Sequence, residues 1–387
     1  MPRPTALVIS LSDLASDPRV DRQIDVLRET HRVIAAGLGP PSEADVDYVD
    51  LRPPPSGTLR RVLQRTRGAL ALLVRRYQTV FWRHPANRHA RALLSRCGAD
   101  LVVANDVPAL PLALDAAAGA PVWFDAHEYA PSEFEDRLWW RLLIRPYVRD
   151  MCARHIPRAA AMTTVSTGIA GQYERDTGMP SRVVLNAPAH QDLAPTPVHD
   201  PIRLFHHGRA DPGRHIERTI EAVRLLDGRF TLDLMLIEGA PGHLDELKRL
   251  AHDDPRIRFR DPCPMREISR VANDFDVGVF LLPPTTLSFE LALPNKLFEF
   301  VQARLAVVVG PSPEMAAVVR EHGLGMVTSN FSPESLADTL GALDAQAVAE
   351  HKQAAHRAAA VLNADAAASV VRDVVAELGA MSSHAAP

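Results

Sequence analysis

Three consecutive residues, Pro294, Asn295 and Lys296, stand where the sequence predicts that a helix begins. They follow an apolar strand and a loop, so the free N–H groups and positive dipole of a helix start would lie beside the Lys296 ammonium. Glu299, one turn further on, offers a carboxylate that can accept two hydrogen bonds from ribose hydroxyls. This combination predicts a site for a nucleoside diphosphate. The alternative is an amphipathic helix start that only packs its leucine and phenylalanine side chains into the core.

A second group of basic residues, Arg209 and Arg214, follows another apolar strand. A guanidinium group can bind phosphate oxygens in bidentate fashion, so two arginines in one loop suit a diphosphate. The alternative, an arginine that only solvates a helix face, fits Arg218 better than Arg209. The strand before them carries His206 and His207, and adjacent strand residues point to opposite faces, which makes them a poor pair of metal ligands.

Polar residues in the first half of the chain also follow apolar strands. His127 and Glu128 come after one strand and Asp106 after another. A histidine in such a loop is a better candidate for acid–base chemistry than one on an apolar face. Asp17 and Arg19 follow the first strand, where Asp17 has the alternative role of a helix cap.

Short apolar strands alternate with helices through both halves of the chain, which predicts parallel sheets covered by helices on both faces. Ligands of such sheets bind beyond the carboxyl ends of the strands. A proline-rich segment without periodicity, 186–201, interrupts the alternation. We therefore predict an α/β protein of two tandem Rossmann-like, doubly wound domains facing an interdomain cleft. The domains are predicted at 1–188 and 202–387 with a linker at 189–201, and the last helices could pack back on the first domain.

The segment from Phe275 to Gly310 resembles the donor-binding motif of GT-B glycosyltransferases of the family-4 (group 1) clan, which PNKLFEFVQARLAVVV matches most specifically. The resemblance implies that Glu299 holds the ribose of a nucleotide-sugar donor. Many members of the clan carry a second glutamate eight positions earlier, near the donor sugar. That position is Leu291 here, and Glu290 beside it is the candidate for this contact.

Further stretches resemble the same clan, among them SDPRVDRQIDVLRETHRVIAAG, which resembles the opening of its members and holds Asp17 and Arg19. LFHHGRADPGRHIERTIEAVRLL resembles the element whose arginine and lysine bind the donor diphosphate, with Arg209 at the first position and Arg214 at the second. WFDAHEYAP resembles the element whose histidine approaches the reacting sugar, and this implies the same role for His127. The resemblance covers most of the chain and is weakest between residues 48 and 96.

The function implied is transfer of a hexosyl or related group from a nucleotide-diphosphate sugar to an acceptor hydroxyl, with retention and without a metal. Asp17 and His127 are the catalytic candidates, and an inverting reaction would require one of them as general base. Arg19, Asp106 and Glu128 are assigned to the acceptor side of the cleft. The acceptor is a glycan, a glycolipid or a small molecule.

No cofactor beyond the donor co-substrate and no metal site are expected. The DxD-like triplets Asp45–Asp47 and Asp274–Asp276 are discounted as metal motifs because they are expected to flank or lie on strands. The three cysteines form no CxxC pair, which indicates a reducing compartment. The apolar stretch in the first residues is too short for the core of a signal peptide, so we expect a cytoplasmic protein. A net charge of -4 argues against a nucleic-acid partner.

Arginines interleave with apolar residues over 60–91, where no acidic residue occurs. This stretch is predicted either to lie on the anionic inner face of the plasma membrane or to form ordinary helices with solvated arginines. Two other functions stay open. One is a sugar-nucleotide epimerase of the same fold, and the other is a non-catalytic protein that binds a sugar or nucleotide, including an inactive subunit.

Overall fold

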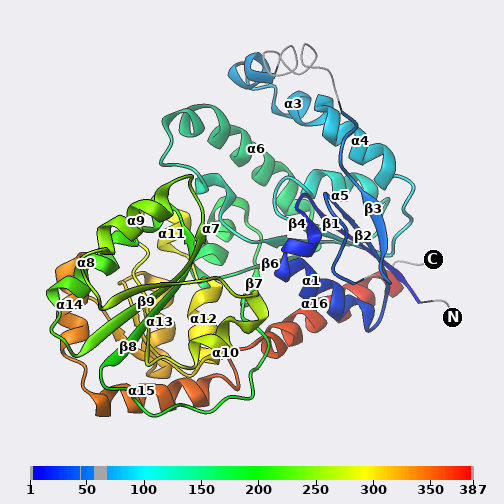
Figure 1. Cartoon of the computed structure of the whole chain (residues 1–387). Helices are drawn as coiled ribbons and strands as arrows, with labels where there is room; N and C mark the ends of the chain where they lie inside the picture. Colours follow the sequence, from blue (N-terminus) through cyan, green and yellow to red (C-terminus); the bar gives the residue numbers. More distant parts are fainter. Residues whose placement is uncertain (1–2, 44, 56–67, 385–387) are drawn as a thin grey trace. The chain divides into compact units, whose positions relative to one another are not determined.

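The computed structural model describes residues 3–43, 45–55 and 68–384, and side chains as far as residue 381. The chain divides into two compact units, the first comprising Met1–Val184 with Ala368–Pro387 and the second comprising Leu185–Ala367. Figure 1 gives the labels of the helices and strands.

The first unit contains a parallel sheet in the order β3-β2-β1-β4-β5-β6-β7. Its strands are β1 (Thr5–Ser10), β2 (Arg32–Gly37), β3 (Asp47–Asp50), β4 (Leu101–Asn105), β5 (Val122–Ala126), β6 (Ala161–Thr164) and β7 (Arg182–Val183). Its helices are α1 (Pro18–Arg28), α3 (Tyr77–Arg83), α4 (Pro85–Leu94), α5 (Leu110–Ala116), α6 (Arg145–His155), α7 (Thr167–Thr177) and most of α16 (Ala364–His384). β1 continues to β2 on one side and pairs with β4 on the other, so the strand order reverses between β1 and β4.

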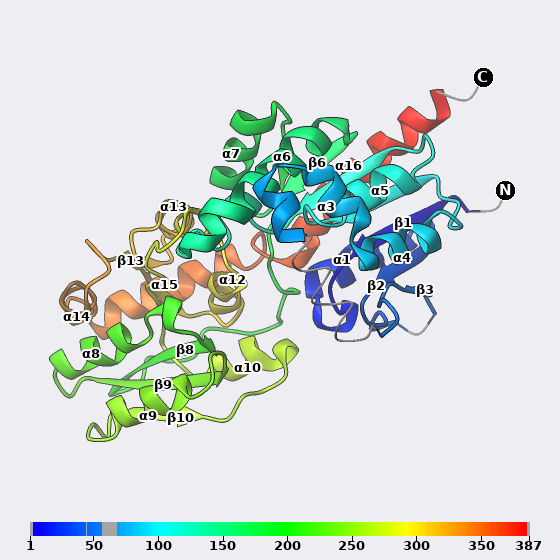
Figure 2. The ribbon, with the colours of Figure 1, turned by 90° about the horizontal axis from the view of Figure 1, so that it is seen from above.

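The second unit repeats this plan with the sheet order β10-β9-β8-β11-β12-β13, and Figure 2 shows β8, β9 and β10 side by side. Its strands are β8 (Ile202–Ala210), β9 (Phe230–Glu238), β10 (Ile257–Arg260), β11 (Val277–Phe280), β12 (Ala306–Val309) and β13 (Gly325–Val327). Its helices are α8 (Glu217–Leu225), α9 (His243–Ala251), α10 (Ile268–Ala272), α11 (Leu287–Glu290), α12 (Asn295–Gln302), α13 (Pro313–His322), α14 (Pro333–Gly341) and α15 (Ala345–Ala358). Here the order reverses between β8 and β11. The predicted α/β class with two parallel-sheet domains is confirmed.

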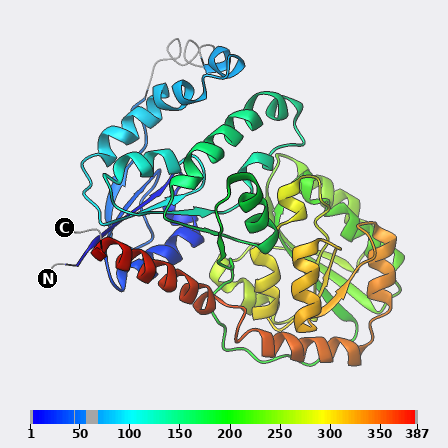
Figure 3. The same ribbon diagram turned by 180° about the vertical axis from the view of Figure 1, so that it is seen from behind.

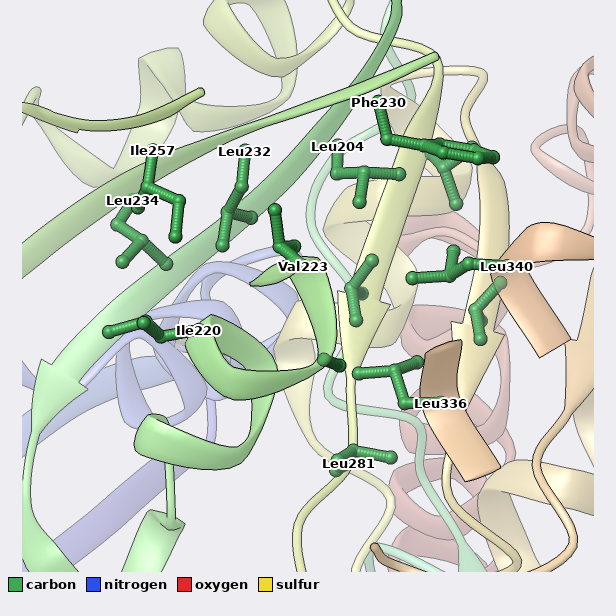
Figure 4. Packing of buried hydrophobic residues seen from close by; sticks show 14 of the residues in the cluster. Leu204, Ile220, Val223, Phe230, Leu232, Leu234, Ile257, Leu281, Leu336 and Leu340 are labelled. Carbon is green, nitrogen blue, oxygen red and sulfur yellow. The ribbon is translucent and has the colours of Figure 1, made fainter. Parts of the chain in front are cut away.

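Apolar side chains fill the space between the second sheet and its helices. Leu204 and Leu232 come from β8 and β9, Leu281 directly follows β11, and Ile220 and Leu336 come from α8 and α14 (Figure 4). A separate cluster that includes residues of α12 and α15 covers other apolar positions of the same strands. Because both faces of each central strand are buried, these strands are continuous apolar runs, which is why the sequence reveals them.

The units divide the chain differently from the predicted domains. The predicted linker, 189–201, belongs to the second unit, where the Gln191 N–H donates to Gln302 Oε1 at 3.0 Å and the Thr196 hydroxyl to the Asn273 carbonyl at 3.1 Å. The last helix, α16, belongs to the first unit from Ala368 onward, and Figure 3 shows this helix in red. Arg372 binds Glu29 at 2.9 Å there. Polar anchors of this kind leave no periodic pattern in a sequence.

The Asp274–Asp276 triplet has a structural role at its last residue. Asp276 is fully buried just before β11, at the amino end of the sheet and away from the ligand-binding edge. Its carboxylate accepts hydrogen bonds from Lys352 Nζ at 3.1 Å and from the Arg203 N–H at 2.9 Å. The other triplet forms exposed ion pairs, Asp45 with Arg28 and Asp47 with Arg32.

We expect Asp276→Ala to destabilise the second unit by about 3–5 kcal/mol, because it leaves the Lys352 ammonium buried without its carboxylate. Urea denaturation followed by circular dichroism measures this loss. The matched control is Asp227→Ala, which removes an aspartate from an exposed ion pair with Arg229 and should change stability little. Equal stabilities of the two variants would contradict the structural role of the buried pair.

Candidate functional site

The second sheet provides a ligand crevice where β8 and β11 part. Their registered pairs are Leu204 with Val277 and Phe205 with Gly278, whereas β8 stays paired with β9 as far as Ala210. The chain leaves β8 toward β9 and leaves β11 toward β12, on opposite sides of this point. Open parallel sheets bind ligands at such a switch point, beyond the carboxyl ends of the strands.

Lys296 lies at this point, in the first turn of α12. Its side chain is buried, with Nζ 3.3 Å from His206 Nε2 and 3.9 Å from the centroid of the Phe280 ring. Burial, and then the charge of Arg214, hold the pKa of Lys296 well below its usual range, although Glu299 acts in the opposite direction. A buried amine in this setting is stabilised in its charged form by a bound anion.

The backbone of Gly208 makes room for the lysine. Its φ angle is 132°, and a Cβ atom at this position would lie 3.1 Å from Lys296 Nζ. Any side chain here would therefore adopt a strained backbone conformation and press on the ammonium group. Gly208 therefore belongs to the positively charged site, because a residue with a side chain would not leave this space for Lys296.

The two predicted arginines converge on one carboxylate that sequence analysis did not select. Arg209 Nε is 3.2 Å and Arg214 Nε is 3.8 Å from the same oxygen, Asp211 Oδ2. The Arg209 side chain is 55% exposed, so its remaining donors can reach a ligand. The charge of Arg214 also acts on Lys296. These cations outnumber the one aspartate beside them, so a diphosphate would neutralise them more completely than Asp211 does.

Glu299 and His207 form a buried contact, with Oε2 and Nε2 3.1 Å apart. Burial lowers the pKa of His207, and Glu299 opposes that shift. His206 and His207 each contact a different donor-site candidate on α12. The sequence signal for this was the HHGR stretch, because its histidines precede Arg209. Asn295 is half-buried at the start of α12, while Glu290 is exposed at the end of α11.

The first unit gathers polar groups around Asp125, the fully buried last-but-one residue of β5. Arg19 donates to both of its carboxylate oxygens at 2.7 Å, and Thr163 and Gln23 donate to it as well. The third nitrogen of Arg19 donates to the Val184 carbonyl at 2.8 Å. Arg19 is therefore buried with its donors engaged. The expectation that it contacts an acceptor is corrected, because the buried carboxylate requires its charge.

His127 lies between two carboxylates. Its Nε2 is 3.3 Å from Asp125 Oδ2 and 3.1 Å from Asn105 Oδ1, while Nδ1 is 3.4 Å from Asp106 Oδ2. Burial alone lowers the pKa of His127, but Asp106 and Asp125 outweigh it and raise that pKa above its ordinary value. The structure thus brings together two predicted residues, His127 and Asp106, with one that was missed. The sequence signal for Asp125 is its place two residues before His127.

The remaining candidates of the first unit have other surroundings. Asp17 caps α1, where its side chain accepts from the Val20 N–H at 3.3 Å. Glu128 is exposed. Desolvation, with the charges of Glu128 and Asp106, raises the pKa of Glu133 to about 7, so this residue is a titratable neighbour that sequence analysis did not select.

Within the described residues, no group of three histidine, cysteine, aspartate or glutamate side chains is arranged to hold a metal ion. None of the helices in the described ranges is long and apolar enough to cross a membrane. The part of the predicted membrane segment at 60–67 lies outside the described residues.

No protein-family model matches the chain, and no curated protein matches it in sequence. Several solved structures do match the chain. Sucrose-phosphate synthase from Thermosynechococcus elongatus matches with a TM-score of 0.71 at 15% identity, covering 98% of this chain and all of the other. HepE of Anabaena, in complex with UDP and glucose, gives 0.69 at 15% identity and coverages of 97% and 100%.

WaaG, a glycosyltransferase involved in lipopolysaccharide biosynthesis, matches with a TM-score of 0.62 at 12% identity, over 95% of this chain and 99% of its own. The chain therefore has the fold of GT-B glycosyltransferases, two Rossmann-like domains in one polypeptide. At these identities the likeness defines the fold alone.

Proposed function

We propose that the protein is a glycosyltransferase that moves a sugar from a nucleotide-diphosphate sugar to an acceptor hydroxyl. The observation that carries this proposal is the buried Lys296 ammonium at the point where β8 and β11 part, on which the charge of Arg214 acts and beside which Arg214 and Arg209 share Asp211. The neighbouring HepE is in complex with UDP and glucose, which supports a uridine nucleotide as the first donor to test.

The proposed mechanism makes the nucleoside diphosphate a good leaving group. Negative charge grows on the diphosphate as the bond to the sugar breaks, and fixed cations beside it lower the barrier. Arg209, Arg214 and Lys296 supply this charge, so the proposal assigns no metal ion. Glu299 accepts hydrogen bonds from the ribose. Retention is the expected stereochemistry, with a diphosphate oxygen taking the proton of the acceptor.

The proposal gives His127 the role of a hydrogen-bond donor to the reacting sugar. Its raised pKa favours the protonated imidazole. Nε2 already faces Asp125 and Asn105, so the proposed donor to the sugar is Nδ1, whose contact with Asp106 is longer, at 3.4 Å. A general base, as an inverting reaction requires, would need the neutral ring instead. We therefore expect activity with His127→Asn to fall without a change in the anomeric configuration of the product.

Consumption of sugar nucleotides tests the proposal. The protein is incubated with UDP-, GDP-, ADP- and dTDP-sugars, with and without simple acceptor sugars, and released nucleoside diphosphate is quantified by chromatography. The proposal predicts release from one nucleotide class, stimulated by an acceptor and lost with Glu299→Ala. An epimerised donor without nucleotide release would support the epimerase instead, and no conversion would support the non-catalytic alternative.

We further propose that the first unit lies on an anionic membrane. A cytoplasmic enzyme would need such a contact to reach a glycolipid acceptor in the inner face of the plasma membrane. Exposed apolar side chains precede α3 and α6, and these two helices pack together, with the rings of Tyr77 and Tyr147 5.8 Å apart. Apolar side chains beside cationic ones are typical of interfacial binding. The exposed apolar residues are Leu70, Leu73, Val74, Leu138, Trp139 and Leu142, and arginines among them are Arg75, Arg76, Arg137 and Arg141.

We expect the protein to sediment with vesicles containing phosphatidylglycerol but not with phosphatidylcholine vesicles. The triple variant L138S/W139S/L142S should bind at least about tenfold more weakly, because each exposed apolar side chain adds favourable transfer free energy. The control L225S removes an exposed leucine of the second unit. Equal binding of the triple variant and the control would contradict the membrane surface.

A further inference from the structure

The side chain of His206 occupies the place where the backbone pairing of β8 and β11 ends. The last registered pair is Phe205 with Gly278. One residue further along β11, the carbonyl of Val279 accepts a hydrogen bond from the His206 ring at 2.8 Å. The imidazole is buried, so it is a fixed part of the switch point.

This hydrogen bond determines which ring nitrogen faces Lys296. A carbonyl oxygen can only accept, so Nδ1 of His206 carries the proton and Nε2 of the neutral ring is an acceptor. Lys296 Nζ lies 3.3 Å from Nε2. Burial, and then the charge of Lys296, hold the pKa of His206 well below its usual range, so the ring keeps this acceptor near neutral pH.

The ammonium group has few other partners that could orient it. The Phe280 ring lies on one side and the Gly208 backbone on another. The charged groups that act on it are Arg214, from the turn after β8, and Glu299, from its own helix. An aromatic face attracts a cation but sets its position only loosely. The directional contact in this surrounding is the lone pair of the histidine.

We propose that His206 is a positioning residue for Lys296. Its imidazole is fixed to the Val279 carbonyl and holds Nζ at the end of β8, where the donor diphosphate binds. This inference rests on the donor site proposed above. The histidine touches no phosphate itself, and it acts by presenting the lysine.

The position has a consequence for pH. Burial and Arg214 lower the pKa of Lys296, so the amine loses its proton at a lower pH than a free lysine does. A bound diphosphate favours the charged amine and raises that pKa. Diphosphate binding therefore takes up a proton, and affinity falls as the pH rises above the pKa of the free site. His206 stabilises the charged amine as an acceptor, so its loss moves this fall to lower pH.

Three substitutions separate the two contacts of the ring. His206→Asn can still donate to Val279 but is too short to accept from Nζ. His206→Gln has the reach to accept from Nζ, and His206→Met fills the space without an acceptor. His252→Asn, on an exposed histidine, is the control. Thermal unfolding shows which variants are folded. If His206→Asn does not fold, His206→Met takes its place in the comparison.

The first readout needs no nucleotide. The chain has only three lysines, Lys248, Lys296 and Lys352, so NMR titration of lysine labelled with ¹³C at Cε resolves each of them, and Lys296→Met assigns the signal. We expect the Lys296 signal to titrate at lower pH in His206→Asn than in the wild type, and near the wild-type pH in His206→Gln. An unchanged titration in both His206→Asn and His206→Met would overturn the inference.

The second readout is calorimetric titration with UDP between pH 6 and pH 9, with uridine as the ligand that lacks phosphate. We expect His206→Asn to weaken UDP binding about tenfold or more, as loss of a hydrogen bond to a charged group does. Its pH profile should shift downward while uridine binding stays unchanged, and His206→Gln should recover most of the affinity. If the wild type binds UDP and His206→Asn binds it with the same affinity and pH profile, the positioning role is contradicted and the donor site is not. No binding of any nucleoside diphosphate by the wild type would defeat the donor site itself.

Discussion

Replacing Lys296 with methionine is expected to lower the turnover of the sugar nucleotide by about two to three orders of magnitude, the usual cost of one preorganised group that stabilises transition-state charge. Methionine keeps the length and apolar stem of the side chain, so the contacts in the core remain. The positive charge beside the leaving diphosphate is lost. Initial rates of nucleotide release, measured with the best donor of the panel, give the ratio.

The matched control is Lys248→Met, which removes an exposed lysine of α9 by the same substitution. Its rate should equal that of the wild type. A Lys296→Met enzyme that keeps more than about a tenth of the wild-type rate would fall far short of the cost expected for an electrostatic group. The diphosphate would then have to be held elsewhere, and Arg209 and Arg214 would become the first residues to test.

Asp125→Ala is expected to reduce the stability of the first unit by about 3–5 kcal/mol, because it leaves the guanidinium of Arg19 buried without a counter-charge. The hydroxyl of Thr163 and the amide of Gln23 lose their acceptor in the same step. Urea denaturation at pH 7 measures the difference. Asp47→Ala, which removes an exposed ion pair with Arg32 from the same sheet, should have little effect.

The acid limb of the stability profile gives this prediction a second test. Despite its burial, Arg19 and His127 hold the pKa of Asp125 far below its ordinary value. A carboxyl whose pKa is depressed by folding contributes stability above its unfolded pKa of about 4 and loses it as the pH falls toward the folded value. The wild type should therefore lose stability below about pH 4, and Asp125→Ala should lose less. Parallel profiles for the two proteins would contradict the buried pair.

The sequence was a good guide to the sheets because buried parallel strands appear as apolar runs between helices. The same alternation placed Lys296, Arg209 and His127 at the carboxyl ends of strands. The switch point depends on strand order instead, and only the structure establishes that β8 and β11 are neighbours there. Local pattern and spacing thus predicted which loops carry the candidate residues, and the strand order determines which of those loops lie at one crevice.

The partners of the site residues were missed for the same reason. Asp211 is the exception, since it follows Arg209 by two residues and could have been noticed from spacing alone. His207 contacts Glu299 across 92 positions of sequence, and Asp125 binds Arg19 across 106. Pairing of this kind follows from strand order and burial, which a single sequence does not specify. The buried role of Arg19 could not be predicted without them.

Calorimetric titration of the wild type, Lys296→Met and Glu299→Ala with UDP, GDP, ADP and dTDP tests the central claim most directly. We expect one nucleoside diphosphate to bind the wild type with well-defined stoichiometry. We also expect much weaker binding by both variants and weak binding of the corresponding monophosphate. Binding of no nucleoside diphosphate, or equal binding by all three proteins, would contradict a donor site at the end of β8.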